Sequence, residues 1–474
     1  MVVGEIATER ELVIIGGGPG GYNAAIRAAQ LGLEVTLIEK GNLGGVCLNE
    51  GCIPSKVFTH AAEKMSEVSH LQELGLGTES SLIDINQLQD YKTKTVAALT
   101  KGVQSLLKQN GVEVVEGTAS FLSSDRIAVE NKDRFEVYRF EKAIVAAGSR
   151  PLEEYNGIAF DGKRVFDPIS IYKAATVPDT LTVYGCDYLA LEAAFSYNAF
   201  GSKVSLILGD GRDDFSFDTS INRELKRLMK KAKIKCYTSC SVERIDADDE
   251  KTQVRLTNKK GEPETVVSEA LMISAGVQPN LEMLGLDRAG VEFVESEYIP
   301  VDDVCRTNVE TIYAVGDVTD GPALAVKAIK QGKAAAEACA GFNSEVDLAF
   351  TPIVVRTVPP VVSVGLTERD AEEQGFDVHV GQFPLGGNGF AAVIGKKDGF
   401  VKVISDKKTD RLLGFHAIGT GAAELVSMGT LALETVARDE DLTFPLYPHP
   451  SLNEAWMEAV EALKGKAVHA APAK

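Results

Sequence analysis

The chain has 474 residues, of which 45% are hydrophobic and 25% are charged, and its formal net charge at pH 7 is −19. This length exceeds what one hydrophobic core supports, so we expect two to four domains with the composition of an ordinary soluble protein. The strong negative charge argues against nucleic acid as a partner, because neutralising phosphates requires clustered lysine and arginine residues.

Neither the N-terminus nor the apolar segments predict a membrane protein. The longest apolar runs, such as residues 143–147, and shorter ones such as residues 12–15, fall far below the ~20 residues that cross a bilayer. Glu5, Glu9 and Arg10 stand where a signal peptide would need an uncharged apolar stretch. We therefore expect a cytoplasmic protein without membrane insertion.

Two segments repeat a strand, helix, strand pattern. From residue 12 the chain reads LVIIGGGPGGYNAAIRAAQLGLEVTLIEK, and from residue 181 it reads LTVYGCDYLALEAAFSYNAFGSKVSLILG. Each segment has a short apolar run, a glycine turn (Gly16, Gly185), a helix-length stretch, a second glycine (Gly32, Gly201) and another apolar run. A glycine directly after a helix is typical of a C-terminal cap. The repeat predicts an α/β fold with two Rossmann-like units.

The first repeat carries the glycine pattern of a dinucleotide-binding site. Gly16, Gly18 and Gly21 form Gly-x-Gly-x-x-Gly between strand and helix, and Glu39 ends the next strand. Such glycines allow a tight turn and bring a pyrophosphate close to the N–H groups at the start of the helix. A glutamate at that place accepts hydrogen bonds from a ribose hydroxyl. We therefore predict a dinucleotide site, with a simple turn glycine as the alternative.

Two of the seven cysteines form a close pair. Cys47 and Cys52 lie five residues apart in a glycine-flanked stretch, and the other five cysteines are scattered singly or loosely, which is not typical of a secreted disulfide framework. Two buried, reduced cysteines are one interpretation of the pair. The other is a redox centre whose disulfide exchanges with a substrate.

The later part of the chain has a different sequence pattern. Residues 311–318 read TIYAVGDV and precede an alanine-rich helix that runs through residue 340. After residue 345, β-like runs at 361–364 and 400–404 and helices near 422–437 and 451–463 predict a separate α+β domain. The last eight residues, AVHAAPAK, predict a frayed tail.

Four motifs resemble the class I pyridine nucleotide-disulfide oxidoreductase family over essentially the whole chain. They are GGVCLNEGCIPSK (44–56), AAGS (146–149), YAVGDV (313–318) and HPSLNEA (449–455). The closest resemblance is to the branch that oxidises dihydrolipoyl groups. The resemblance implies an FAD-binding domain from residues 1–150 and 281–348, an NAD-type domain from 151–280, and a C-terminal dimerisation domain from 349–474.

The resemblance implies that the first nucleotide unit holds FAD. In the family, a lysine near the reactive nitrogen of the flavin pairs with a glutamate on the helix of the second unit, and Lys56 and Glu192 match these positions. A solvated surface pair is the alternative. The residues expected around FAD, besides the three glycines and Glu39, are Lys40, Gly45, Lys56, Gly148 and Asp317.

The resemblance also assigns the thiol chemistry. It implies that Cys52 faces the flavin and that Cys47 exchanges with the substrate disulfide. His449 resembles the catalytic base that keeps such a thiol reactive, and Glu454 resembles the carboxylate that orients the base. In the family this histidine comes from the partner subunit, so we expect a homodimer.

The second repeat lacks the acid of the first. Glu39 lies 23 positions after Gly16, and 23 positions after Gly185 stands Leu208. An aliphatic side chain cannot accept hydrogen bonds from a ribose.

The second repeat also departs from the glycine pattern. Asp187 stands at the second glycine position and Ala190, which the pattern tolerates, at the third. A carboxylate there can cap its own helix and repel phosphates. Gln278 stands where the family usually has an arginine. We expect NAD binding to be weakened or lost, with ordinary NAD binding through the backbone as the alternative.

The resemblance implies that the chain oxidises dihydrolipoyl groups, free or on a lipoyl-carrying protein, as part of cell redox homeostasis. Either NAD or another carrier, such as a ferredoxin, a second flavoprotein or a quinone, accepts the electrons. A non-catalytic FAD-binding subunit is a further alternative, against which the intact cysteine pair argues. The sequence predicts no metal site.

Overall fold

The computed structural model describes residues 7–76, 83–132, 134–209, 211–294 and 297–470. The chain divides into two compact units. The first unit draws on Met1–Pro54, Gln89–Leu152 and Gly276–Leu348, and the second on Ser55–Leu88, Glu153–Ala275 and Ala349–Lys474. Within the parts that the structure describes, no helix is long and apolar enough to cross a membrane.

The first unit is built on a seven-stranded sheet with the order β3-β2-β1-β6-β5-β4, and β19 also pairs with β6. The strands β1, β2, β3, β6 and β19 pair in parallel, whereas β4, β5 and β6 form an antiparallel ribbon. The bounds are β1 (Ala7–Ile15), β2 (Val35–Glu39), β3 (Glu113–Glu116), β4 (Thr118–Ser123), β5 (Arg126–Asn131), β6 (Arg134–Val145) and β19 (Ile312–Ala314).

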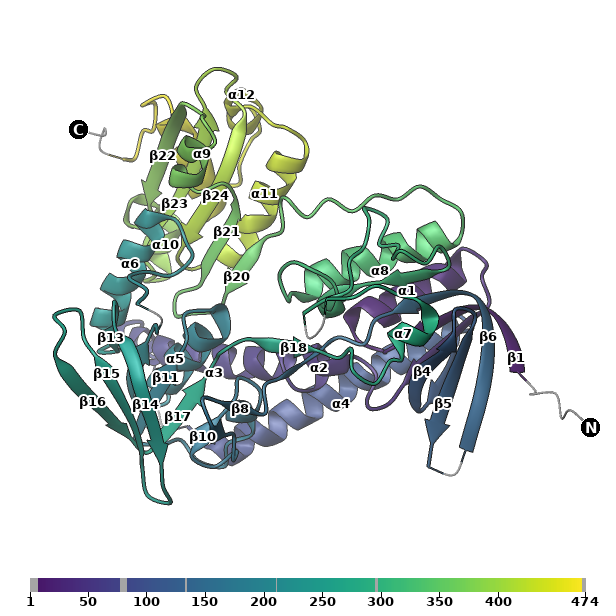
Figure 1. The fold of residues 1–474 in the computed structure, drawn as a ribbon. Coiled ribbons are helices and arrows are strands. Elements are labelled where there is room, and N and C mark those ends of the chain that lie inside the picture. Colours follow the sequence, from purple (N-terminus) through teal and green to yellow (C-terminus); the bar gives the residue numbers. More distant parts are fainter. Residues whose placement is uncertain (1–6, 77–82, 133, 210, 295–296, 471–474) are drawn as a thin grey trace, which may run out of the picture. The chain divides into compact units, whose positions relative to one another are not determined.

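Two helices of the first unit lie side by side against this sheet (Figure 1). They are α1 (Pro19–Gln30) and α8 (Ala325–Cys339). A Cβ atom on Gly332 would lie 2.3 Å from the Gly20 carbonyl oxygen, so the helices approach more closely than a larger residue would permit. The shorter elements of the unit are α2 (Gly45–Asn49), β7 (Ser149–Pro151), which pairs with β18 (Val277–Pro279), and α7 (Leu286–Ala289).

The second unit contains a five-stranded parallel sheet with the order β10-β17-β11-β12-β13. The helices α5 (Tyr188–Ala199) and α6 (Thr219–Lys231) follow β11 and β12. The strand bounds are β10 (Val165–Phe166), β11 (Thr180–Tyr184), β12 (Lys203–Ile207), β13 (Lys235–Tyr237) and β17 (Ala270–Ile273). Smaller antiparallel elements are β8 (Glu154–Tyr155), β9 (Ile158–Ala159), β14 (Ser241–Ala247), β15 (Thr252–Thr257) and β16 (Pro263–Ser268).

The C-terminal part of the second unit is an antiparallel sheet with the order β20-β21-β24-β23-β22. Its strands are β20 (Ile353–Val355), β21 (Val361–Gly365), β22 (Val378–Pro384), β23 (Phe400–Asp406) and β24 (Leu412–Ile418). Its helices are α9 (Glu368–Glu373), α10 (Gly389–Val393), α11 (Ala422–Glu434), α12 (Asp439–Thr443) and α13 (Asn453–Ala462). Trp456 is fully buried in this part, and its ring centroid lies 4.9 Å from that of Phe415.

The predicted fold class is confirmed. The two repeats fold as β1, α1, β2 and as β11, α5, β12, each with parallel pairing of its strands, and the C-terminal part is α+β. The chain also contains two long helices, α3 (Cys52–Glu73) and α4 (Ile85–Gln109). The division into four segments with the boundaries given above stays a prediction.

The prediction of a frayed tail is wrong for its described residues. The N–H groups of Val468 and His469 donate to Glu458 Oε2 over 2.9 and 3.1 Å. Glu458 is a buried carboxylate on α13, and it gains two backbone donors from the tail. Residues 471–474 lie outside the described part of the chain.

A buried ion cluster ties α6 to the C-terminal sheet. Lys402 on β23 donates to both carboxylate oxygens of Asp218 over 2.8 and 2.9 Å and to Glu368 over 2.6 Å. The side chains of Lys402 and Asp218 are each 1% exposed. Burial alone would raise the pKa of Asp218, but the hydrogen bond and ion pair with Lys402 outweigh burial and lower it.

Replacing Lys402 with methionine should lower the free energy of unfolding in urea by about 3–5 kcal/mol, because a buried carboxylate then loses its cation. Lys407 is the control, since it is 43% exposed and pairs with Asp377 at the surface. Lys407→Met should cost at most about 1 kcal/mol. Equal costs for the two variants would contradict the importance of the buried cluster.

The cluster also predicts how stability depends on pH. The pKa of Asp218 is lower in the folded chain than in the unfolded chain. Its contribution is therefore fully present above the unfolded pKa of about 3.9 and is lost as the pH falls through the folded pKa. In Lys402→Met this loss on acidification should be smaller, as measured by urea unfolding at several pH values.

Candidate functional site

The first nucleotide unit has an open helix N-terminus. The N-cap of α1 is Gly18, and no side chain in the described structure caps this helix. A Cβ on Gly16, which has φ of 102°, would lie 2.3 Å from the Ala146 carbonyl oxygen, and a Cβ on Gly21 would lie 1.8 Å from the Gly16 carbonyl oxygen. The turn therefore requires glycine, and the N–H groups of the first helical turn can receive a pyrophosphate.

The carboxylate of Glu39 lies over this turn. Its Oε2 accepts from the Gly17 N–H at 2.6 Å, and its Oε1 accepts from the Gly41 N–H at 2.7 Å. Two backbone donors thus fix the carboxylate at the carboxyl end of β2, where a carboxylate oxygen can still accept from a ribose hydroxyl. Lys40 follows at the surface. These residues fit the adenosine and pyrophosphate of FAD.

Asp317 and Gly148 lie in the same unit. Ser149 Oγ donates to Asp317 Oδ2 at 2.7 Å, and the Gly148 carbonyl accepts from the Asn280 N–H at 2.9 Å. Gln331 on α8 holds Gly316, the residue before Asp317, because the Gln331 Oε1 accepts from the Gly316 N–H at 2.8 Å. The sequence reasoning missed this glutamine, although a polar residue facing inward from an alanine-rich helix was a usable signal.

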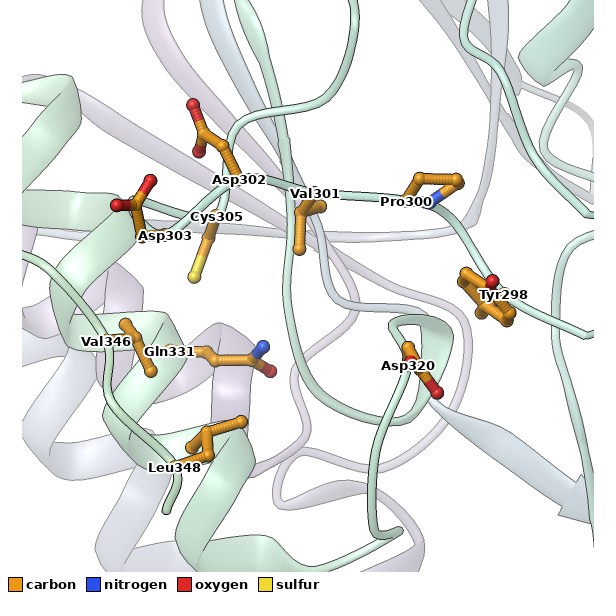
Figure 2. A pocket seen from close by; sticks show the side chains of 10 residues that line it. All are labelled: Tyr298, Pro300, Val301, Asp302, Asp303, Cys305, Asp320, Gln331, Val346 and Leu348. Atoms are coloured by element: carbon orange, nitrogen blue, oxygen red, sulfur yellow. The ribbon is translucent and has the colours of Figure 1, made fainter.

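Gln331 also lines a cavity of about 350 Å³, together with Asp302, Asp303 and Asp320, among others (Figure 2). Asp302 Oδ1 already accepts from the Val304 and Arg306 N–H groups over 3.1 and 2.7 Å. None of the predicted site residues lines this cavity. Nowhere in the described residues do three or more His, Cys, Asp or Glu side chains form a group that could hold a metal ion.

The cysteine pair occupies a break between two helices. Cys47 lies in α2, Cys52 is the first residue of α3, and both are half-buried. Gly44 and Gly45 before the pair have φ of 95° and 59°, which favours glycine. Asn49, between the cysteines, donates to the carbonyls of Leu43 and Gly45 over 3.0 and 2.9 Å and thereby holds the loop in place.

Lys56 and Glu192 form an ion pair. The Lys56 Nζ lies 2.9 Å from Glu192 Oε2 and 3.0 Å from Oε1. The Glu192 side chain is fully buried, whereas that of Lys56 is 36% exposed. Glu192 also accepts from the Arg356 N–H at 3.0 Å. A fully buried carboxylate that accepts three hydrogen bonds from two donor groups is not a solvated surface pair, so that alternative is excluded.

His449 and Glu454 form a second pair. His449 Nδ1 lies 2.8 Å from Glu454 Oε1, and Glu454 Oε2 accepts from the Ser451 N–H at 2.9 Å. Burial would raise the pKa of Glu454, but its hydrogen bonds with His449 and Ser451 lower it. The imidazole is 81% exposed, so a carboxylate holds the ring while its Nε2 edge can reach another molecule.

The second nucleotide unit has a closed helix N-terminus. Asp187 is the N-cap of α5, and its Oδ1 accepts from the Ala190 N–H at 2.9 Å. Ser274 Oγ, at the end of β17, donates to the other carboxylate oxygen at 2.6 Å. Burial raises the pKa of Asp187. The helix N–H that a pyrophosphate would use is therefore already bonded to a side chain.

The residue of this unit that corresponds to Glu39 is apolar. Leu208 is 2% exposed and packs in the core of the unit, and its N–H donates to the Tyr237 carbonyl at 3.0 Å. Gly185 retains the turn, with φ of 137° and a hypothetical Cβ 2.7 Å from the Ser274 carbonyl oxygen. Gln278 belongs to the first unit, where its amide donates to Glu282 at 2.9 Å.

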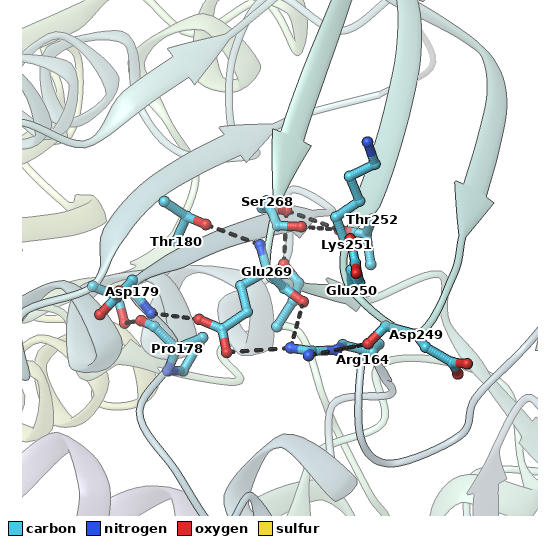
Figure 3. A network of polar contacts seen from close by, with 12 residues as sticks. Arg164, Pro178, Asp179, Thr180, Asp249, Glu250, Lys251, Thr252, Ser268 and Glu269 are labelled. Atoms are coloured by element: carbon cyan, nitrogen blue, oxygen red, sulfur yellow. Dashed lines mark hydrogen bonds and ion pairs between the residues drawn. The ribbon is translucent and has the colours of Figure 1, made fainter.

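A cavity of about 560 Å³ in the second unit lies away from these residues. Figure 3 shows the network beside it, in which the Glu269 N–H donates to Thr180 Oγ1 at 2.9 Å and the Glu269 carboxylate accepts from Asp179 N–H at 2.9 Å. Arg164 donates to the same carboxylate at 3.2 Å. Thr180 begins β11, whereas nucleotides bind at the carboxyl ends of parallel strands. The network therefore fixes the opposite edge of the sheet.

Two family models match the chain. The model described as pyridine nucleotide-disulphide oxidoreductase matches residues 10–332. The model of the dimerisation domain of the same family matches residues 351–460. The second match includes His449 and Glu454.

Similar proteins cover the whole chain. It is 39% identical over 470 residues to the dihydrolipoyl dehydrogenase of Geobacillus stearothermophilus, with 99% of each chain covered. It is 38% identical over 473 residues to the dihydrolipoyl dehydrogenase of Halobacterium salinarum, again with 99% of each covered. LpdA from Mycobacterium tuberculosis has a TM-score of 0.88 at 26% identity, covering 96% of this chain and 100% of that one.

Replacing Glu39 with glutamine should weaken FAD binding by about 10- to 100-fold, because a hydrogen bond to a charged acceptor contributes about 1.5–3 kcal/mol. The measurement is the fluorescence of flavin released on dilution. Glu34→Gln is the control, since Glu34 is 66% exposed at the other end of β2. Equal FAD retention by the two variants would contradict the placement of the ribose at Glu39.

Proposed function

Because the chain belongs to the pyridine nucleotide-disulphide oxidoreductase family, we propose that it oxidises dihydrolipoyl groups through Cys47 and Cys52. As a member of that family it is a flavin-dependent disulfide oxidoreductase that resembles dihydrolipoyl dehydrogenase, and FAD is its cofactor. The observation that carries the proposal is the hydrogen bond between His449 and Glu454, because thiol exchange needs a base held in one orientation.

The proposed reaction begins with thiol exchange. The substrate dithiol loses two protons and two electrons as its sulfur atoms join, and the Cys47–Cys52 disulfide is reduced to two thiols. His449 takes the proton of the attacking thiol, while Glu454 stabilises the imidazolium. FAD, when bound, supplies the acceptor for the two electrons that leave the cysteine pair.

We place His449 at the cysteine pair of a second copy of the chain. The family's dimerisation domain covers residues 351–460 and therefore contains the histidine, and the exposed imidazole is accessible to another molecule. A homodimer built in this way has two active sites, each of which uses residues of both copies.

Replacing His449 with alanine should slow dithiol oxidation by roughly 10²–10⁴-fold, the usual effect of a lost general base, while FAD content stays unchanged. The measurement is the rate of flavin reduction by dihydrolipoamide. His379→Ala is the control, because His379 lies on β22 and outside the motif. Near-normal oxidation by His449→Ala would refute the role of the histidine.

We further propose that NAD⁺ is a poor acceptor for this enzyme. Asp187 bonds the Ala190 N–H and places a carboxyl group where a phosphate would lie. Two like charges ~4 Å apart cost about 1 kcal/mol in water and about 4 kcal/mol at an intermediate effective dielectric. Leu208 offers the ribose no acceptor. Electrons then leave through a ferredoxin, a second flavoprotein or a quinone.

The variants Asp187→Gly and Leu208→Glu introduce the residues that the first repeat has at these positions, and they test whether NAD⁺ is a poor acceptor. The unmodified enzyme should be reduced readily by dihydrolipoamide, yet it should reduce NAD⁺ slowly or bind it very weakly. The double variant should gain more NAD-linked activity than either single variant, because both positions act on one ligand. A micromolar KM for NAD⁺ in the unmodified enzyme, or NAD⁺ lying across residues 185–190 in a soaked crystal, would overturn this proposal.

A further inference from the structure

A buried asparagine from another element holds the segment that follows His449. Asn388 is 4% exposed and is the N-cap of α10. Its Oδ1 accepts from the Ala391 N–H at 2.9 Å, and its Nδ2 donates to the Ser451 carbonyl oxygen at 2.9 Å. The side-chain amide thus accepts one hydrogen bond from its own helix and donates another to residue 451.

The second of these bonds leads to the imidazole. The Ser451 N–H donates to Glu454 Oε2 at 2.9 Å, and Glu454 Oε1 lies 2.8 Å from His449 Nδ1. Ser451 Oγ donates back to the Pro448 carbonyl at 2.6 Å. The position of Ser451 therefore sets the position of the carboxylate, and the carboxylate sets the orientation of the ring.

We propose that Asn388 is a positioning residue for His449. The inference rests on the proposed function, in which His449 is the base. In the single chain the imidazole is 81% exposed, so packing within its own chain does not fix the ring, and Glu454 orients it. Asn388 anchors that carboxylate from a buried site, through Ser451. A misplacement of about 1 Å in a catalytic group can cost about 10²-fold in rate.

Substitutions at residue 388 can remove the hydrogen bond to Ser451 and keep the one to the Ala391 N–H. Aspartate and serine both cap helices well, so Asn388→Asp and Asn388→Ser preserve the bond to the Ala391 N–H. Neither variant keeps the donor to the Ser451 carbonyl, because a carboxylate has no proton to donate and a serine hydroxyl is too short to reach. The two variants differ in charge, so an effect that they share comes from the lost donor.

The experiment compares these variants with Thr367→Ala, which removes the N-cap of α9 in the same antiparallel domain. Both Asn388 variants should lose about 10- to 100-fold in kcat for dihydrolipoamide, with KM changed less than about twofold and FAD content unchanged. Thr367→Ala should lower the thermal midpoint and leave kcat unchanged. Wild-type kcat in both Asn388 variants, or a change in KM alone, would overturn the proposal.

His449→Ala, assayed in parallel, distinguishes a failure of the proposed role of Asn388 from a failure of the proposed function. If His449→Ala is slow and both Asn388 variants are normal, only the positioning role of Asn388 is wrong. If His449→Ala itself oxidises dihydrolipoamide at the normal rate, the proposed function is wrong. A crystal structure of Asn388→Ser that shows Ser451 and Glu454 unmoved would also overturn the positioning role.

Discussion

The central constraint in this chain is which acceptor bonds to the backbone N–H groups at the start of one helix in each nucleotide unit. Both units place a helix N-terminus at the carboxyl end of a central parallel strand, where an anion is favoured. In α1 the N-cap is Gly18, which leaves those donors open, and in α5 it is Asp187, which bonds to one of them. One N–H group cannot serve both a side chain and a phosphate, so the two helices differ in the backbone donors that they offer to an anion.

The sequence predicted the features that rest on local pattern. Apolar runs and glycine spacing predicted both repeats, and the capping role of Asp187 followed from its position after the first glycine of the second repeat. The sequence did not predict Ser274 as the second partner of Asp187, because 87 positions separate them. Lys402 and Asp218 are 184 positions apart, and no periodicity relates a strand lysine to a distant helix cap.

The C-terminal tail shows why composition fails where one buried acceptor decides the structure. An alanine- and proline-rich ending has little apolar surface to bury, so composition predicts fraying. Glu458 is 2% exposed, and a buried carboxylate is costly unless donors satisfy it. The backbone of Val468 and His469 provides two of these donors, which any residue except proline would have offered, and the His469 ring lies 2.5 Å from the other carboxylate oxygen. The information therefore lies in two particular residues, Glu458 in the helix and His469 in the tail, and not in the overall composition of the tail.

The two changes in the second unit also stabilise it in the absence of a ligand. A side-chain N-cap contributes about 1 kcal/mol over an uncapped helix, and a fully buried leucine contributes about 1.5–3 kcal/mol relative to an exposed one. An open helix N-terminus and a polar ribose acceptor, by contrast, are functional features that cost stability until the ligand binds. Asp187 and Leu208 thus favour the fold of the unit itself. The pair of His449 and Glu454 differs from these two residues, because its imidazole is 81% exposed and contributes nothing to a core. The chain thus combines an exposed, hydrogen-bonded histidine with a second nucleotide unit whose helix N-terminus is closed by a side chain.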